Sequence, residues 1–465
     1  MQSNVQANFL IRAAASLKHP LVSDISCLTA AQYVAAGLGL LATALAARAL
    51  GPADFGKFAL ITAYPILLWS AMSVKSVSIT TRYLSGFKAQ GRESQLRGMC
   101  KLGYSLDLML ACLVLVVVSL TGWWVAQSFY NLPRSAWLMS LFAASFPPAS
   151  LRGTSQAVLS VYSRFRLLAG FQLLDPGLTL FLVAVFLLSG FGVAGVIVAH
   201  ALGQAAAGLA LMLAATRVLH QHGLGFWWQG SVSSLGCLRR EISAFFGWNF
   251  LAVTLNGLLN QAPIMALGSL RGPIEAGHYR LAFSLMTVGS YLEASMGRVT
   301  YPLLSARWAA GERESIKNSL WRWTLRGGLP ISLLLLLSIP VLPSLIPIVF
   351  GQVYSPVIEA IQIMMVAAAV SVLFFWVTNF YYASGRIGLW TKAVLINTVL
   401  VLALGWFSIQ HWGFLGMAAV FTLGKSAFTL LLAGNTLIFP GHQDGASDDI
   451  CNTVEKSRRG HDRLF

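Results

Sequence analysis

Two short stretches of the sequence, 221 positions apart, decide the fold. They read RALGPADFGKFAL (residues 48–60) and SLRGPIEAGHYRL (residues 269–281). The matched positions are Gly51 and Gly272, Pro52 and Pro273, Asp54 and Glu275, Gly56 and Gly277, Phe58 and Tyr279, Leu60 and Leu281. The same ungapped shift aligns Arg92-Glu93-Ser94 with Arg313-Glu314-Ser315, and Gly192 and Gly195 with Gly413 and Gly416. One shift that serves three separated regions indicates that the chain is a duplication of one unit.

The composition places this duplicated unit in a membrane. Of 465 residues, 56% are hydrophobic and only 10% are charged, and the mean hydropathy is +0.69. In a soluble protein about a quarter of all residues are charged, because the surface must face water. We therefore expect an integral membrane protein.

Apolar runs of about 20 residues, the length that crosses the hydrocarbon core of a bilayer, occur twelve times. They cover residues 26–49, 57–76, 103–126, 136–161, 167–189, 191–215, 243–268, 279–303, 327–350, 357–382, 388–409 and 413–438. Each repeat therefore holds six spans, and because six is even, both repeats enter the membrane from the same side. The expected fold is all-α, with about 12 transmembrane helices in two parallel six-helix lobes.

The basic residues indicate the orientation. Of the 32 Lys and Arg residues, 24 fall in segments or at span ends on the side of both termini, three fall within spans away from their ends, and five fall in the loops or at the adjoining span ends on the other side. Those five are Arg48, Lys57, Arg134, Arg271 and Arg280. The positive-inside rule then predicts cytoplasmic termini, and the net charge of +16 gives no reason to expect nucleic-acid binding. The expected organisation is a cytoplasmic segment (1–24), an N-lobe (25–217), a cytoplasmic linker (218–242), a C-lobe (243–438) and a cytoplasmic tail (439–465).

The repeated motif, which we call the box, is expected to form the outer hairpin between the first two spans of each lobe. Glycine allows a tight turn, proline stops the preceding helix, and a carboxylate suits the N-terminus of the next helix. We interpret both boxes as scaffold. Their residues are Gly51, Pro52, Asp54 and Gly56 in the N-lobe, and Gly272, Pro273, Glu275 and Gly277 in the C-lobe.

The box and two further strings resemble the Wzx-type polysaccharide (O-antigen) flippases of the multidrug/oligosaccharidyl-lipid/polysaccharide exporter superfamily. The strings are ARALGPADFGKFAL, RGTSQAVLSVYSRFRLLA at the end of the fourth span and VFGQVYSPVIEAIQIM before the tenth. The resemblance implies a MATE/flippase-like fold in the bacterial cytoplasmic (inner) membrane. It also implies that an undecaprenyl-diphosphate-linked oligosaccharide (an O-antigen, capsule or exopolysaccharide repeat unit) crosses by alternating access through a cationic cleft.

The same resemblance implies the partners: the lipid-linked oligosaccharide, the bilayer and other polysaccharide-assembly membrane proteins, without a cofactor or nucleic acid. Relatives often carry an acidic residue near the LLNQ string of the seventh span, where this chain has Ala262.

Charged residues inside spans cost at least a few kcal/mol and usually face a cavity or a partner. The repeat shift aligns such residues with uncharged ones, which suggests that they handle substrate rather than build the fold; Lys425, for example, aligns with Gln204. We assign substrate binding in the cationic cleft to Arg48, Arg152, Arg298 and Lys425. The candidates for ion coupling or for a structural ion pair are Asp175, Asp107 and Glu293.

Several of these assignments have alternatives. Arg152 and Asp175 occupy similar depths on consecutive spans, roughly 16 and 12 Å from the inner end, so we expect an ion pair that is either structural or substrate-handling. Pro147-Pro148 and Pro176 are expected to loosen the two helices beside this pair. Arg298 can instead reach the cytoplasmic interface, and Arg48 can anchor the opposite one.

No catalytic residue, metal site or enzymatic activity is expected. The LGKS string at 423–426 lacks the first glycine and the preceding strand of a phosphate-binding loop, which disfavours an ATP-driven pump. One alternative is an ion-coupled small-molecule or drug antiporter of the same superfamily. Four acidic residues inside spans favour it: Asp107, Asp175, Glu293 and Glu359. A membrane polysaccharide-biosynthesis enzyme is the other, disfavoured by short outer loops.

Overall fold

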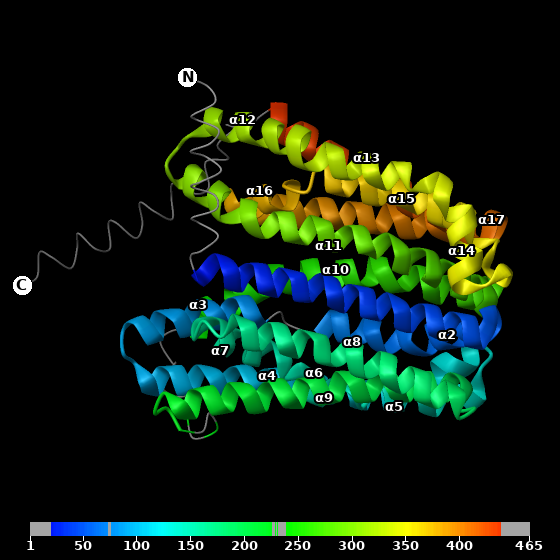
Figure 1. Ribbon diagram of the computed structural model, residues 1–465, viewed down its shortest axis with the longest axis horizontal. Coiled ribbons are helices and arrows are strands. Elements are labelled where there is room, and N and C mark those ends of the chain that lie inside the picture. Colours follow the sequence, from blue (N-terminus) through cyan, green and yellow to red (C-terminus); the bar gives the residue numbers. More distant parts are fainter. Residues whose placement is uncertain (1–19, 73–75, 226–227, 229, 231–238, 439–465) are drawn as a thin grey trace, which may run out of the picture.

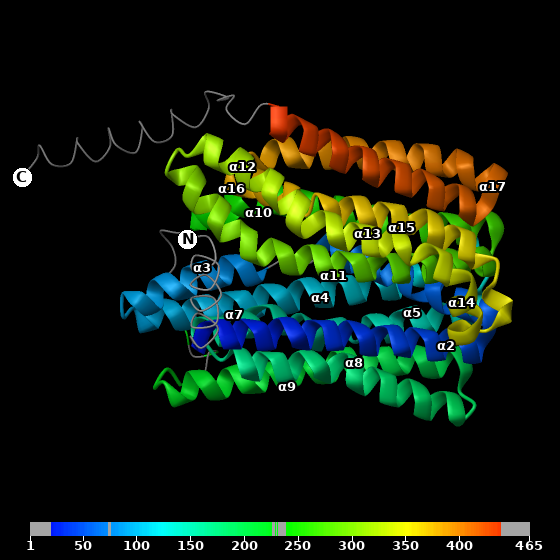
Figure 2. The ribbon, with the colours of Figure 1, turned by 45° about the horizontal axis from the view of Figure 1, so that its top comes forward.

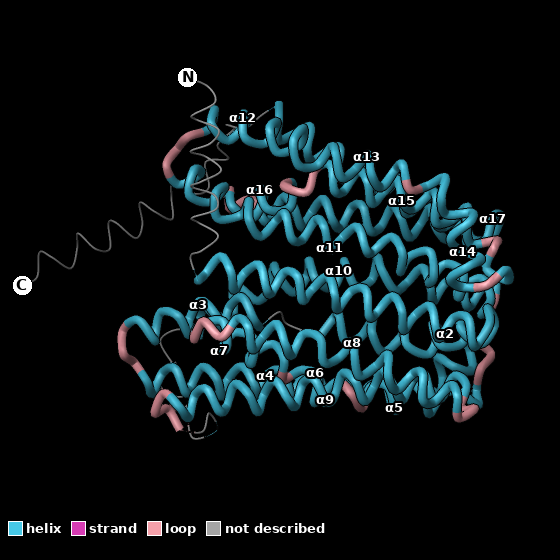
Figure 3. Tube along the Cα trace, in the orientation of Figure 1, coloured by secondary structure: helices cyan, strands magenta, loops and turns pink. Residues whose placement is uncertain are grey.

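The computed structural model describes residues 20–72, 76–225, 228, 230 and 239–438, and in this part of the chain every regular element is a helix (Figure 3). The expected all-α membrane fold is confirmed. The first half contains α2 (Pro20–Met72), α3 (Ser76–Ala89), α4 (Glu93–Ser128), η1 (Pro133–Ser135), α5 (Ala136–Ala143), α6 (Phe146–Ser150), α7 (Arg152–Val161), α8 (Phe165–Leu188) and α9 (Gly192–Gln221).

The second half repeats the order of spans, although its third span is divided where that of the first half is the single helix α4. It contains α10 (Arg239–Arg271), α11 (Pro273–Ala309), α12 (Arg313–Trp323), η4 (Thr324–Gly328), α13 (Leu329–Leu337), η5 (Ile339–Val341), α14 (Leu342–Phe350), η6 (Gln352–Tyr354), α15 (Val357–Leu373), α16 (Val377–Ala383) and α17 (Ile387–Ile438).

Breaks inside the helical runs give six membrane crossings in each half of the described chain. Helices α2 and α17 each contain two spans, divided at Gly51 and Gly413. The fourth span is divided into α5, α6 and α7, and the tenth into α15 and α16, which are bent by 42°. By length and hydropathy alone, only six described helices pass as spans, or seven with the bent pair. Helices α10 and α11 are not among them, because they carry more polar residues.

The backbone carries the same repeat as the sequence. The first glycines of the two boxes, Gly51 and Gly272, have φ values of 72° and 92°, and a second pair of glycines related by the repeat, Gly192 and Gly413, have φ values of 55° and 59°. Positive φ is a left-handed conformation that glycine adopts without a steric penalty. Glycine at these positions therefore lets both halves make the same turns.

The two lobes, α2–α9 and α10–α17, lie side by side with their long helices along a common direction (Figures 1 and 2). Helix α2 packs against both α10 and α11 at the interface. We call the end of the bundle that holds the two box turns the box end. The opposite end, which holds the turns at 90–92, 162–164 and 310–312, is called the basic end.

The hydrophobic core is shared at one end of the bundle and divided at the other. At the box end, residues of both lobes form one continuous cluster that includes Phe55, Leu60 and Tyr279. Toward the basic end there are two separate clusters, one around Cys100 in the N-lobe and one around Trp376 in the C-lobe. Among the described residues, the lobes thus share one buried apolar core at the box end, whereas toward the basic end each lobe has a core of its own.

The two boxes contact each other across the lobe interface. Gly56 lies so close to the carbonyl group of Pro273 that a Cβ atom would not fit. Reciprocally, a Cβ on Gly277 would lie 2.9 Å from the Pro52 carbonyl oxygen and 3.0 Å from the Gly56 Cα. The motif occurs twice because each copy is one half of this backbone contact.

Candidate functional site

A polar groove lies between the lobes. Its volume is about 420 Å³, and its walls come from α2 and α8 of the N-lobe and from α11 of the C-lobe. The polar lining residues are Gln32, Thr43, Gln172, Ser284, Thr287 and Tyr291. On α11 they are spaced three and four apart, so they share one helix face. The groove therefore offers amide and hydroxyl groups that can hydrogen bond to a hydroxyl-rich ligand.

Arg280 lies on the same face of α11, one turn nearer the box end than Ser284. The Ser284 hydroxyl donates a 2.8 Å hydrogen bond to the Arg280 carbonyl, and Arg280 Nη1 lies 3.5 Å from Gln261 Oε1. Its charge also acts electrostatically on His200, which belongs to the N-lobe. Seven residues separate Arg280 from the start of α11, roughly 10 Å at 1.5 Å per residue. Arg280 is not among the residues that line the groove, but this arrangement puts a cation one helical turn beyond its box-end limit.

Sequence reasoning missed Arg280 because it counted this arginine with the outer loops. The structure corrects that count, since α11 begins at Pro273. A signal for it was present: the repeat shift aligns Arg280 with Ala59. Lys425 was chosen as a candidate on the same ground, because the repeat shift aligns it with an uncharged residue.

Arg152 and Asp175 form the expected ion pair. Arg152 Nη1 lies 2.7 Å from Asp175 Oδ2, and the two side chains retain only 28% and 24% of their surface exposed. Arg152 Nη2 also donates a 2.7 Å bond to the Gln204 carbonyl, and Thr179 Oγ1 donates a 3.3 Å bond to Asp175 Oδ1. Pro176, the next residue, lines the interlobe groove. The pair therefore ties α7 to α8 and α9 beside the groove.

The two proline sites behave differently. Pro147-Pro148 coincides with the broken fourth span, as expected, whereas α8 continues through Pro176.

Asp107 is buried at 8% exposure and accepts a 3.1 Å hydrogen bond from Thr154 Oγ1. It lies inside the N-lobe, between α4 and α7.

Glu293 and Lys425 line one polar cavity inside the C-lobe. The cavity has a volume of about 310 Å³, and three asparagines, Asn256, Asn260 and Asn397, contribute to its wall. The Lys425 ammonium group exerts a Coulombic attraction on Glu293. The sequence placed both residues inside spans but did not place them together, because the eighth and twelfth spans are far apart in the chain.

The other predicted cations have separate locations. Arg48 is exposed at the box end, where its Nη1 donates a 2.9 Å hydrogen bond to the Ile348 carbonyl of the C-lobe. Arg298 lies on α11, and its side chain is outside the described part of the structure. Arg48, Arg152 and Lys425 are thus not gathered at one point, and none of them is among the residues that line the interlobe groove.

The protein is a multi-pass membrane protein, because its helices include several that are long and apolar enough to cross a bilayer, and they form two lobes with a polar groove between them. Comparison with known proteins gives its family. The model of the family described as "Polysaccharide biosynthesis protein" matches residues 21–308. The chain therefore belongs to the polysaccharide biosynthesis protein family. It is also 22% identical to inner membrane protein YghQ of Escherichia coli (strain K12) over 337 residues, which are 72% of this chain and 93% of that protein.

Solved structures share the fold at low sequence identity. An inward-facing MATE family multidrug resistance transporter of the MOP superfamily superposes with a TM-score of 0.70 at 14% identity, covering 85% of this chain and 92% of that one. Lipid II flippase MurJ in an inward closed conformation superposes with a TM-score of 0.65 at 12% identity, covering 88% and 87%. These likenesses confirm the MATE/flippase-like fold.

Proposed function

We propose that the chain is a flippase that moves an undecaprenyl-diphosphate-linked oligosaccharide from the cytoplasmic to the periplasmic leaflet of the bacterial inner membrane. Membership of the polysaccharide biosynthesis protein family and the fold shared with MurJ both support this class of substrate. With the basic end in the cytoplasm, both termini are cytoplasmic. No covalent chemistry is required of the protein.

The observation that carries the proposal is the position of Arg280, one helical turn beyond the box-end limit of the polar groove and on the same face of α11 as Ser284. A diphosphate needs charge-assisted hydrogen bonds when it leaves water, and a guanidinium group supplies them in a fork that matches phosphate oxygens. The hydroxyl groups of the α11 face and the amide groups of Gln32 and Gln172 on the facing helices then meet the sugars that follow the diphosphate. The prenyl chain stays in lipid between the lobes.

Alternating access follows from the unequal packing of the two ends. Among the described residues, the lobes share one core at the box end and have separate cores toward the basic end, which favours entry of substrate into the groove from the basic end. Release on the other side requires the box contacts to separate. It also requires loss of two interlobe hydrogen bonds, from Arg48 to Ile348 and from the Tyr354 hydroxyl to the Ala47 carbonyl at 2.8 Å.

The test is complementation of a flippase-null strain, with blots for surface glycan and for the protein. We expect Arg280→Ala to retain membrane abundance and to lose glycan export, because one charged hydrogen bond contributes about 1.5–3 kcal/mol. Arg280→Lys should retain partial export. The matched control is Arg134→Ala, which removes an exposed arginine at the box end. Full export by Arg280→Ala would exclude a phosphate-binding role for this groove.

One observation favours a second candidate, an ion-coupled small-molecule antiporter. Glu293 lines a polar cavity of the C-lobe, a setting in which a carboxylate can bind a cation or a proton. Glu359, by contrast, is exposed in the first turn of α15 and no longer counts as an intramembrane acid. The antiporter predicts transport that depends on Glu293 and not on Arg280, so the same complementation set separates the two functions.

A further inference from the structure

A second basic site lies outside the groove, at the basic end of the C-lobe. Its volume is about 600 Å³, and we call it the C-lobe basic pocket. Three arginines and three large apolar residues define it: Arg307, Arg322, Arg326, Met296, Trp323 and Phe375. They come from α11, α12, η4 and the bend between α15 and α16. Among the described residues that line this pocket there is no carboxylate.

Two of the arginines are held by neighbouring residues of α12. Arg307 donates from Nη1 to the Ser319 hydroxyl, and Arg322 donates from Nε to the Asn318 carbonyl over 3.2 Å. These bonds fix the two guanidinium groups at one turn of α12 and use one N–H group of each. The remaining N–H groups of each fork can reach a ligand with several acceptor oxygens.

The third arginine is presented by a backbone irregularity. Residues 324–328 form a π-helix between α12 and α13, and both Arg326 and Gly327 line the pocket. A π turn is rare and is frequently found at functional sites. Residues of the tenth span hold this π-helix in place. Trp376 Nε1 donates a 2.8 Å hydrogen bond to Thr324 Oγ1, and Gly328 packs directly on the Leu373 carbonyl.

The surroundings of the pocket are those of a lipid surface. Trp321 and Leu325, which flank the lining residues, have 48% and 53% of their surface exposed, and the following helix α13 exposes a run of leucines. Met296 and Phe375 supply an apolar wall beside the guanidinium groups. Basic pockets of this kind at the cytoplasmic ends of transmembrane helices bind phosphate headgroups of lipids.

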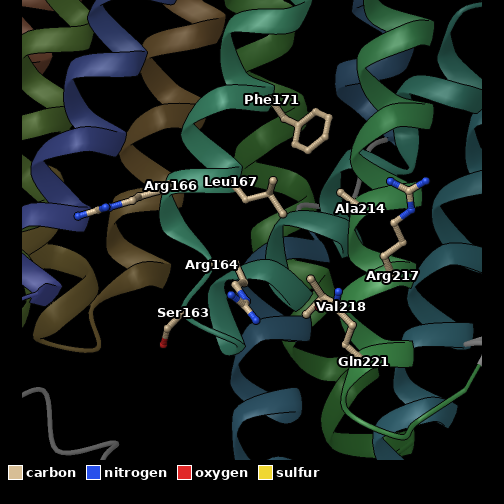
Figure 4. Close-up of a pocket in the computed structure, with 9 residues that line it drawn as sticks. All are labelled: Ser163, Arg164, Arg166, Leu167, Phe171, Ala214, Arg217, Val218 and Gln221. Atoms are coloured by element: carbon tan, nitrogen blue, oxygen red, sulfur yellow. The ribbon is translucent and has the colours of Figure 1, made fainter.

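The N-lobe does not repeat this pocket. The 221-residue shift aligns Arg307, Arg322 and Arg326 with Gly86, Lys101 and Ser105, so only one cation has a counterpart. The N-lobe has a different basic pocket, of about 510 Å³, between α8 and α9 (Figure 4). There the side chains of Arg164, Arg166 and Arg217 extend in different directions, with Arg166 pointing away from Phe171 (Figure 4). This second pocket offers matched arginines at the same end of the bundle.

We propose that Arg307, Arg322 and Arg326 bind the phosphate-bearing headgroup of a membrane lipid in the C-lobe basic pocket. The ligand chemistry is a phosphate or diphosphate ester attached to an apolar chain. Two sources supply it: an anionic phospholipid of the inner leaflet, or the diphosphate of the lipid-linked substrate before it enters the groove. Only the second source rests on the proposed function.

The experiment uses the purified full-length protein in phosphatidylcholine nanodiscs. Binding of two probes, farnesyl diphosphate and short-chain phosphatidylglycerol, is measured by calorimetric titration. Each lost charged hydrogen bond weakens binding by about tenfold or more, so Arg322→Gln with Arg326→Gln should raise the Kd of a bound probe at least by that factor. Arg326→Gln alone is the variant least able to disturb folding, because this side chain is exposed. The control is Arg164→Gln with Arg217→Gln, which removes the same charge from the same end of the bundle.

Three results support the proposal and identify the source. Loss of affinity for both probes indicates a general phosphate-lipid site, loss for farnesyl diphosphate alone indicates the substrate, and loss for phosphatidylglycerol alone indicates a resident phospholipid. Unchanged affinity in both C-lobe variants overturns it. An equal loss of affinity in the control variant also overturns the proposal, because it would mean that the probes are attracted by the total charge of the protein and not by this pocket. Export by Arg280→Ala is measured separately, so failure of either proposal leaves the other intact.

Discussion

The two lobes share a backbone plan and differ in their polar interior. Equivalent glycines make equivalent turns, and the two boxes meet in a reciprocal contact. Inside the N-lobe, Arg152 and Asp175 are joined at 2.7 Å, whereas in the C-lobe Glu293 and Lys425 line a cavity walled by asparagines. One lobe neutralises its charges internally, and the other keeps them beside a space that a ligand or an ion can enter. We therefore propose that the duplicated residues build the fold and that the residues that differ between the lobes carry the function.

The largest effect is expected from breaking the N-lobe pair. Arg152→Ala leaves Asp175 alone in a partly buried site, which should cost about 3 kcal/mol, the lower end of the range for a broken buried pair, because about a quarter of each side chain is exposed. Membrane abundance and thermal unfolding of the purified protein measure the loss. The double variant Arg152→Ala with Asp175→Ala, which removes both partners, should regain part of the lost stability. A stable but inactive Arg152→Ala would assign the arginine to substrate handling instead.

The box contact is expected to show the next largest effect. Gly56→Ala forces a Cβ against the Pro273 carbonyl, and overpacking of this kind costs about 1–3 kcal/mol. Gly277→Ala should cost less, since the corresponding distances are 2.9 and 3.0 Å. The unfolding temperature of each variant measures this difference. Gly37→Ala on the same helix as Gly56 is the control, because nothing lies within 4 Å of its Cβ position. An equal loss at Gly37 and Gly56 would show that steric contact is not the cause.

The two box carboxylates are expected to differ from each other in their effect on stability. Glu275 Oε2 accepts a 2.7 Å hydrogen bond from the Phe414 backbone at the start of the last span, so Glu275→Ala should cost about 1.5–3 kcal/mol. Asp54 pairs only with Lys57 in its own turn, and both side chains are exposed, so Asp54→Ala should cost less than about 1 kcal/mol. Thermal unfolding of the two variants side by side tests the order. A larger loss at Asp54 would contradict it.

The sequence predicted what depends on local pattern and on the repeat. Hydropathy located the spans, and the box located the glycines with positive φ, because both signals are contained in short stretches. It also predicted the Arg152–Asp175 pair, whose members lie on consecutive helices at similar depth. What it missed depends on packing between distant helices. The shared cavity of Glu293 and Lys425 and the groove position of Arg280 both need the interhelical arrangement, and Arg280 was further hidden by a helix start set a few residues too late.

The smallest effect on stability is expected in the C-lobe, and it sharpens the comparison most. Across the asparagine-walled cavity, the coupling between Glu293 and Lys425 in a double-mutant cycle should be below about 1 kcal/mol, and weaker than the coupling between the directly bonded Arg152 and Asp175. Lys425→Ala should keep its membrane abundance and still lose glycan export, with partial export by Lys425→Arg, because the ammonium group then serves a ligand rather than its neighbour. Unfolding temperatures of the four proteins give the coupling, and complementation gives the export. A coupling as strong as that of Arg152 and Asp175, together with full export by Lys425→Ala, would make the two lobes alike and remove this cavity from the transport mechanism.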